Sequence, residues 1–195
     1  MKNLPGCMYK LILVLLSVFV INFFAQAGSC YQTALITYPE YNKNWKQVYY
    51  GKQNQEVISQ WIPSYSYTND WMESVVFHSY NYAKGNSCYK FMMTLINNVA
   101  SRNKTLKYQV LKDNFEDSVA IWCAEKNSSM AAQCEIIRVT AGYEGLLSIH
   151  YINKNKDNFL YQKDAWLKIV RNVRIYYSYF RWDRVMQKAT SVPLD

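Results

Sequence analysis

Side chains that commonly carry out catalysis are scarce in this sequence. Its 195 residues include 2 histidines, His78 and His150, and neither belongs to a nucleophile elbow, an H-E-x-x-H helix or a glycine-rich phosphate loop. His150 is expected at an outward or half-buried position of a strand. Glu73 and His78 share a predicted strand, but their odd separation places the two side chains on opposite faces. The histidines therefore do not indicate an active site.

A pair of carboxylates is the other arrangement that could support acid–base chemistry. Glu56 and Glu73 fall on neighbouring predicted strands, where they could approximate the two carboxylates of a hydrolase. Exposed strand carboxylates are far more often structural than catalytic. We therefore predict no catalytic residues and no cofactor, with a secreted hydrolase that uses carboxylates or a histidine as the alternative.

The cysteines predict a disulfide framework. Cys30, Cys88, Cys123 and Cys134 follow the N-terminal apolar segment, and an even number of cysteines is typical of an oxidising compartment. Cys123 and Cys134 flank a polar turn between two predicted strands, so we expect a bond that closes a hairpin and contributes about 2–3 kcal/mol. Cys30 and Cys88 then form the second pair. No metal site is predicted, because no two cysteines have CxxC spacing.

The N-terminal segment has the three parts of a secretory signal peptide. Two lysines flank the start of an apolar run at 11–24, which is followed by a small-x-small signature. We predict cleavage between Ala27 and Gly28, which makes 1–27 the signal peptide and 28–195 the mature chain. An uncleaved short anchor is one alternative.

A second alternative is a lipid anchor. Small residues precede Cys30, so the segment resembles a bacterial lipoprotein signal, in which the cysteine is lipidated. Ala27 departs from that pattern, because a larger aliphatic residue is usual at its position. A membrane association is expected only if Cys30 carries a lipid.

The mature chain is predicted to be mildly basic. Removing two lysines from the 22 basic residues leaves 20 against 14 acidic ones, a net charge of +6. Basic and aromatic residues are interleaved in the C-terminal segment at about 174–195, which could bind anions or sugar rings. The candidate binding residues there are Arg174, Tyr177, Arg181, Trp182 and Arg184. The simpler interpretation is that the aromatic rings pack on the fold while the charges stay solvated. A nucleic-acid partner is not expected.

The remaining pattern predicts one α+β domain. Hydrophobic residues make up 50% of the chain and charged residues 18%, which excludes a disordered protein. Runs typical of strands alternate with two amphipathic helices, one that begins after an N-cap at Ser87 and one that begins near Asp157. We expect both helices to cover the same core. The expected strands are 45–50, 55–62, 71–79, 108–111, 119–123, 134–141 and 146–152, with the first helix at 88–99.

This order of elements resembles the PsbP-like fold. The similarity rests on the run Trp45…Val48…Glu56…Ile58…Pro63…Asn69…Trp71…Glu73 and on Gly142…Gly145-Leu146…Ile149 before the closing helix. The fold includes a photosystem extrinsic subunit, a Ran-binding nuclear-transport factor and exported bacterial proteins of unknown role, and the chain is most similar to the last group. The resemblance covers about residues 40–175 and implies a mainly antiparallel sheet of six or seven strands in an α/β/α sandwich. It concerns the fold rather than an activity.

Together these features predict an exported bacterial protein, periplasmic or extracellular, that is not an enzyme. It would bind an unidentified protein or envelope component through an aromatic surface. The secreted hydrolase and the envelope protein anchored through Cys30 remain the alternatives.

Overall fold

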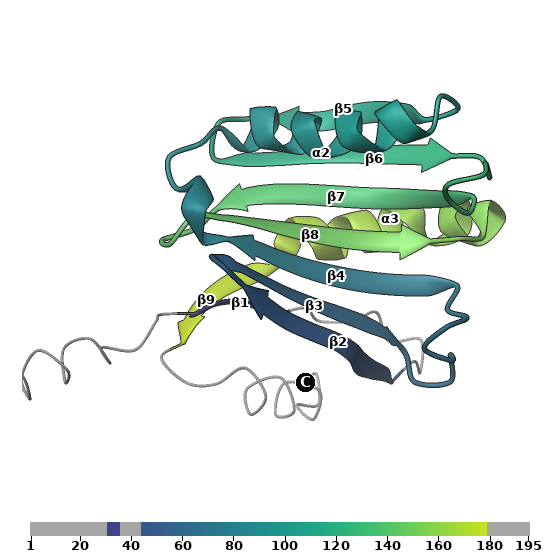
Figure 1. The fold of residues 1–195 in the computed structure, drawn as a ribbon, viewed down its shortest axis with the longest axis horizontal. Helices are drawn as coiled ribbons and strands as arrows, with labels where there is room; N and C mark the ends of the chain where they lie inside the picture. The colour runs from purple at the N-terminus through teal and green to yellow at the C-terminus, as the bar shows by residue number, and fades with distance from the viewer. Residues whose placement is uncertain (1–30, 36–43, 179–195) are drawn as a thin grey trace, which may run out of the picture.

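The computed structural model describes residues 31–35 and 44–178 (Figure 1). Nine strands, two α-helices and one short 3-10 helix lie within these residues. In chain order they are β1 (Tyr31–Leu35), β2 (Trp45–Gln53), β3 (Glu56–Pro63), β4 (Glu73–Tyr80), η1 (Asn81–Ala83), α2 (Cys88–Arg102), β5 (Lys107–Asp113), β6 (Asp117–Ala124), β7 (Gln133–Ala141), β8 (Leu146–Asn153), α3 (Lys156–Asn172) and β9 (Arg174–Ser178). All the predicted strands and helices are present, and β1 and β9 are additional.

Seven strands form one antiparallel sheet in the order β2-β3-β4-β8-β7-β6-β5. The hairpins β2–β3 and β6–β7 join sequence neighbours, whereas β4 lies beside β8, which is far from it in the chain. The seam between β4 and β8 therefore joins the N-terminal and C-terminal halves of the sheet. The predicted α+β class with a mainly antiparallel sheet is confirmed. The PsbP-like label stays a prediction.

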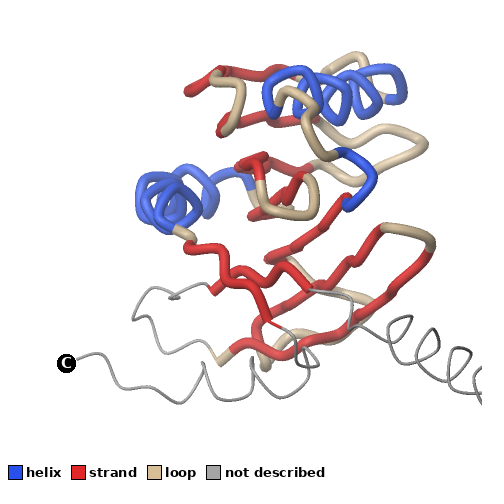
Figure 2. The backbone as a smooth tube through the Cα atoms, turned by 90° about the vertical axis from the view of Figure 1, so that its left-hand side faces the viewer, coloured by secondary structure: helices blue, strands red, loops and turns tan. Residues whose placement is uncertain are grey.

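The two helices lie on opposite faces of the sheet (Figures 1 and 2). α2 packs on β6 and β7, and α3 packs on β7 and β8 from the other side. The side chains of neighbouring residues in β7 therefore point to opposite faces. Ile136 belongs to the buried cluster beneath α3, and Ile137 belongs to the one beneath α2. The expectation that both helices cover one core is wrong. An apolar stripe indicates that a helix packs on a sheet but not which face it covers.

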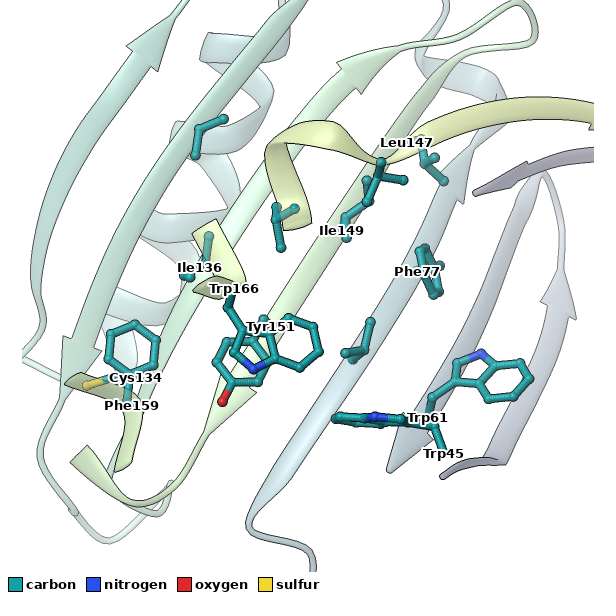
Figure 3. Close-up of a cluster of buried hydrophobic side chains, with 14 residues drawn as sticks. Trp45, Trp61, Phe77, Cys134, Ile136, Leu147, Ile149, Tyr151, Phe159 and Trp166 are labelled. Carbon is teal, nitrogen blue, oxygen red and sulfur yellow. The ribbon is translucent and has the colours of Figure 1, made fainter. Parts of the chain in front are cut away.

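The core on the α3 side is rich in aromatic rings (Figure 3). The rings of Tyr151 and Trp166 stack with their centroids 4.0 Å apart, and Trp45 meets Trp166 edge to face at 5.6 Å. Gln162 on α3 accepts hydrogen bonds from Trp166 Nε1 and Tyr151 Oη, at 3.1 and 3.2 Å. These bonds satisfy the polar atoms of two rings that are buried among apolar neighbours. Ile175 of β9 packs against the same cluster.

The core on the α2 side is smaller and contains fewer aromatic rings. Cys88, Met92 and Ile96 recur along one stripe of α2 and are buried against the sheet. Ser87 caps the helix as predicted, since its side chain accepts a hydrogen bond from the backbone N–H of Lys90. The second helix starts slightly earlier than predicted. Asn155 rather than Asp157 caps α3, because its amide oxygen accepts from Asn158 N at 2.9 Å.

The predicted disulfide between Cys123 and Cys134 is confirmed. The two residues face each other across the β6–β7 hairpin, at the end where the strands meet their connecting turn. Cys88 is a free, fully buried cysteine, and burial raises the pKa of its thiol to about 11. Its predicted partner, Cys30, lies outside the described residues, so that pairing stays a prediction.

Other predicted features lie partly or wholly outside the described residues. The signal-peptide cleavage site at Ala27 and Gly28 is among them, as are three members of the C-terminal candidate surface, Arg181, Trp182 and Arg184. The other two members, Arg174 and Tyr177, belong to β9 and pair with Leu35 and Gln32 of β1. Within residues 31–35 and 44–178, no helix has the length and apolar character required to span a membrane.

Candidate functional site

Two glutamates and both histidines form a diagonal row across the α2 side of the sheet. The row runs from Glu56 on β3 through His78 on β4 and His150 on β8 to Glu135 on β7. The strand register sets this geometry, because each step moves one strand across and two residues along. All four side chains therefore point to the same face. We call these four residues the diagonal row.

Each histidine of the row is bonded to a carboxylate. His78 Nε2 lies 2.9 Å from Glu56 Oε2, and His150 Nδ1 lies 2.6 Å from Glu135 Oε1. The other ring nitrogen of His150 lies 2.7 Å from Ser148 Oγ. The row is thus two imidazole–carboxylate pairs, which meet at the seam between β4 and β8.

Exposure decreases along the row. The side chain of Glu56 is 39% exposed and that of His78 20%, whereas His150 is 16% exposed and Glu135 7%. The N-terminal pair can therefore meet a ligand directly, while the C-terminal pair is mostly enclosed. A mostly enclosed carboxylate needs a bonded partner, and His150 supplies it.

Burial lowers the pKa of His78 below its ordinary value of 6.5, and the hydrogen bond and charge of Glu56 oppose this effect only in part. A positive charge on His150 would lower the pKa of His78 further, since the two imidazoles are neighbours in the row. His78 is therefore neutral at pH 7, and Glu56 then has no cationic partner in the row.

One flank of the row is apolar and reaches the surface. Ile58, Val76 and Ile152 occupy the next diagonal of the same face, one on each of β3, β4 and β8, and all three are half-buried. We call these three residues the apolar strip. In the described part of the chain, α2 makes its main sheet contacts with β6 and β7 and not with the strands of the strip.

The other flank is closed by α2. Tyr80, Ser148 and Ile137 form the diagonal on that side, and all three are buried. The ring of Phe91 on α2 contacts Tyr80 at a centroid distance of 4.7 Å, and Tyr80 stacks on His78 at 4.0 Å. Burial raises the pKa of Tyr80, so its hydroxyl stays protonated and hydrogen-bonded to Ser148. Within the described residues, the row thus marks the edge between the half of this face that α2 covers and the half that α2 leaves uncovered.

Ser148, His150 and Glu135 have the atomic order of a catalytic triad. The imidazole joins the serine hydroxyl through Nε2 and the carboxylate through Nδ1, as a general base does. Two features oppose this role. Ser148 is 0% exposed, so a substrate carbonyl has no route to its oxygen. β8 also pairs with strands on both sides, which commits its backbone N–H groups to the sheet rather than to an oxyanion.

The carboxylate pair of Glu56 and Glu73 that the sequence left open does not form, because the two side chains lie on opposite faces of the sheet. Glu73 points to the α3 side, where its Oε1 accepts a hydrogen bond from Asn158 Nδ2 at 3.0 Å. Glu56 lies on the other face, opposite Tyr80 at the far end of β4. The predicted placement of Glu73 and His78 on opposite faces is confirmed, as is the half-buried position of His150.

Within the described ranges, no group of three or more histidine, cysteine or acidic side chains could hold a metal ion. In comparisons with known proteins, no family model, curated protein or solved structure matches the chain.

Proposed function

We propose that the protein is an exported, non-enzymatic binding protein, periplasmic or extracellular, that engages a protein or envelope component of a bacterial cell. Its binding surface would be the uncovered half of the α2 face. The observation that carries this proposal is the apolar strip beside the diagonal row, where Ile58, Val76 and Ile152 stay half-exposed although the opposite face is packed with aromatic rings.

Export is supported by the disulfide between Cys123 and Cys134, since such bonds persist in oxidising compartments. Intact-mass analysis of the protein from the producing cell, without reduction, tests this part. We expect the mass of a chain that begins at Gly28. Added acyl mass at Cys30 would instead assign the protein to the lipid-anchored envelope proteins, and a full-length reduced chain would contradict export.

The binding surface can be tested by crosslinking with a matched pair of variants. Val76→Asp places a charge in the apolar strip, whereas Tyr161→Asp places one on α3, where the side chain is 85% exposed on the other face. The proposal expects one set of crosslinked partners for the wild type and for Tyr161→Asp, and its loss in Val76→Asp. Equal crosslinking by all three proteins would contradict it.

The atomic order of Ser148, His150 and Glu135 supports a hydrolase as the second candidate. A fluorophosphonate probe forms a covalent bond with an activated serine and separates the two functions. Labelling of the wild type that is lost in Ser148→Ala would favour the hydrolase. We expect no labelling of either protein, because Ser148 is buried.

A further inference from the structure

We propose that the protein binds peripherally to an anionic phospholipid bilayer through one end of its large sheet, the end at the right of Figure 1. Four connections lie there: 64–72 between β3 and β4, 103–106 between α2 and β5, 125–132 between β6 and β7, and 154–155 between β8 and α3. This surface is an end of the sheet rather than its α2 face, so the inference goes beyond the proposed function. An exported protein would meet such a bilayer at the outer side of the membrane that it has crossed.

Hydrogen bonds hold two of these connections side by side. Asn127 Nδ2, in the β6–β7 connection, donates to the backbone carbonyl of Arg102 at 2.8 Å. Asn103 Nδ2, in the α2–β5 connection, donates to the backbone carbonyl of Glu125 at 2.7 Å. The C-terminus of α2 and the β6–β7 turn therefore form one corner of the molecule.

This corner carries a concentration of positive charge. Four basic residues project from it, and all four are exposed: Arg102, Lys104, Lys107 and Lys126. Within the described residues, none of the four forms an ion pair. The neighbouring carboxylate, Glu125, lies 3.3 Å from Lys156 Nζ and is neutralised by it. Five basic residues against one glutamate give a net charge of +4. We call the four residues without an ion pair the basic corner.

Large apolar side chains lie at the same end of the sheet. In the β3–β4 connection, Tyr65 is 65% exposed, Tyr67 80% and Met72 47%. The backbone N–H of Lys154 donates to the carbonyl of Met72 at 2.8 Å, and Lys154 Nζ lies 3.7 Å from the ring centre of Trp71. The aromatic connection is thus fixed beside the β8–α3 connection, which leads to Lys156.

A bilayer matches this combination of side chains better than an anionic polymer does. Anionic headgroups attract lysine and arginine, and each basic side chain near the surface raises the affinity about fivefold. Aromatic rings and methionine suit the boundary between the headgroups and the acyl chains. An anionic polymer would use the basic corner but leave Tyr67 and Met72 in water. The exposed acidic residues at this end, Asp70 and Asp157, lie outside the basic corner.

Vesicle sedimentation tests the inference. The protein purified from the producing cell is mixed with vesicles of phosphatidylcholine alone or with vesicles that also contain phosphatidylglycerol. We expect binding to be at least about tenfold tighter to the phosphatidylglycerol vesicles in about 0.1 M salt. This preference should be lost in about 1 M salt, which screens surface charge. Equal binding to the two kinds of vesicle, or binding to neither, would overturn the inference.

Matched charge reversals locate the surface. The double variant Lys104→Glu/Lys126→Glu reverses two charges of the basic corner. The double variant Lys90→Glu/Lys168→Glu makes the same change in net charge at exposed positions on α2 and α3. We expect the first to weaken binding to phosphatidylglycerol vesicles at least about tenfold and the second less than about threefold. An equal effect of the two double variants would overturn the inference.

Met72→Ser separates a bilayer from an anionic polymer. This change removes an exposed apolar side chain without altering the charge. It should weaken binding to phosphatidylglycerol vesicles about threefold and leave any binding to soluble polyphosphate unchanged. Vesicle binding that is unaffected by Met72→Ser, or polyphosphate binding tighter than vesicle binding, would assign the basic corner to an anionic polymer and overturn the inference. The crosslinking test with Val76→Asp is independent of these measurements.

Discussion

The two faces of the central sheet differ in what their side chains do. On the α3 face, Tyr151, Phe159 and Trp166 are almost fully buried, and the polar atoms of Tyr151 and Trp166 are bonded to Gln162. On the α2 face, helix coverage ends at the diagonal row, and apolar and ionisable side chains remain half-exposed beyond it. The comparison indicates that the α3 face is closed by buried aromatic packing, and that the half of the α2 face that α2 leaves uncovered can vary at moderate cost to folding.

The strongest test of this comparison is Trp166→Ala. Removing a fully buried aromatic side chain from the α3 face should lower the free energy of unfolding by about 4 kcal/mol. Chemical denaturation monitored by circular dichroism would measure the change. Tyr161→Ala on the same helix is the control, since its ring is 85% exposed, and it should change stability by less than about 0.5 kcal/mol. Similar losses in the two variants would contradict the assignment of stability to the buried face.

The disulfide should have the next largest effect. Cys134 belongs to the α3-side cluster, so the bond adds a covalent constraint to the face that is already the better packed. Replacing Cys123 and Cys134 together by alanine should lower the free energy of unfolding by about 2–3 kcal/mol. The single variant Cys88→Ala provides a comparison on the α2 side. An unchanged denaturation midpoint in the double variant would show that the bond is not formed in the isolated protein.

Acidification should affect the α2 face first. Because burial lowers the pKa of His78 in the folded state, the unfolded chain binds a proton more readily below the ordinary value of 6.5. The contribution of His78 to stability is then fully present above about pH 6.5 and decreases as the pH falls toward its lowered folded-state pKa. Denaturation at several pH values between about 5.5 and 7.5 would measure this slope. His78→Gln should flatten it, and a slope that is unchanged in that variant would assign the effect to other groups.

The smallest expected effect on stability is that of Glu56→Gln. Its side chain is 39% exposed, and its bond to a neutral His78 is made in partial contact with water, so the free energy of unfolding should change by less than about 0.5 kcal/mol. Thermal denaturation near pH 7 would check this value. A loss as large as that of Trp166→Ala would place the diagonal row in the stabilising core and remove the distinction between the two faces.

Local pattern is enough to predict much of the fold. The period of two in the predicted strand 71–79 puts Val75 and Phe77 on one face and His78 on the other, as β4 does. The polar turn between Cys123 and Cys134 predicts the disulfide that joins them. The pair β1–β9 is different, because its strands come from opposite ends of the described chain. No local period indicates such a pairing.

The sequence can predict each of the two histidine–glutamate pairs of the diagonal row, but not that the pairs lie side by side. Strand parity shows that Glu56 and His78 can share a face, since β3 and β4 follow each other in the chain and pair as neighbours. It shows the same for Glu135 and His150 on β7 and β8. No local sequence pattern indicates that β4 pairs with β8. This pairing depends on tertiary packing, and it brings the two histidine–glutamate pairs together. Without that pairing, Glu73 is an equally plausible partner for Glu56 from sequence alone, although its side chain points to the other face.

The central position of β8 also constrains when the proposed binding face can exist. Glu56 and His78 precede α2 in the chain, whereas Glu135 and His150 follow it, and β8 is the last strand of the large sheet to be synthesised. A nascent or truncated chain that ends before β8 can form the hairpins on either side but not a continuous surface between them. If that face binds a partner as proposed, recognition would be restricted to molecules that have completed folding.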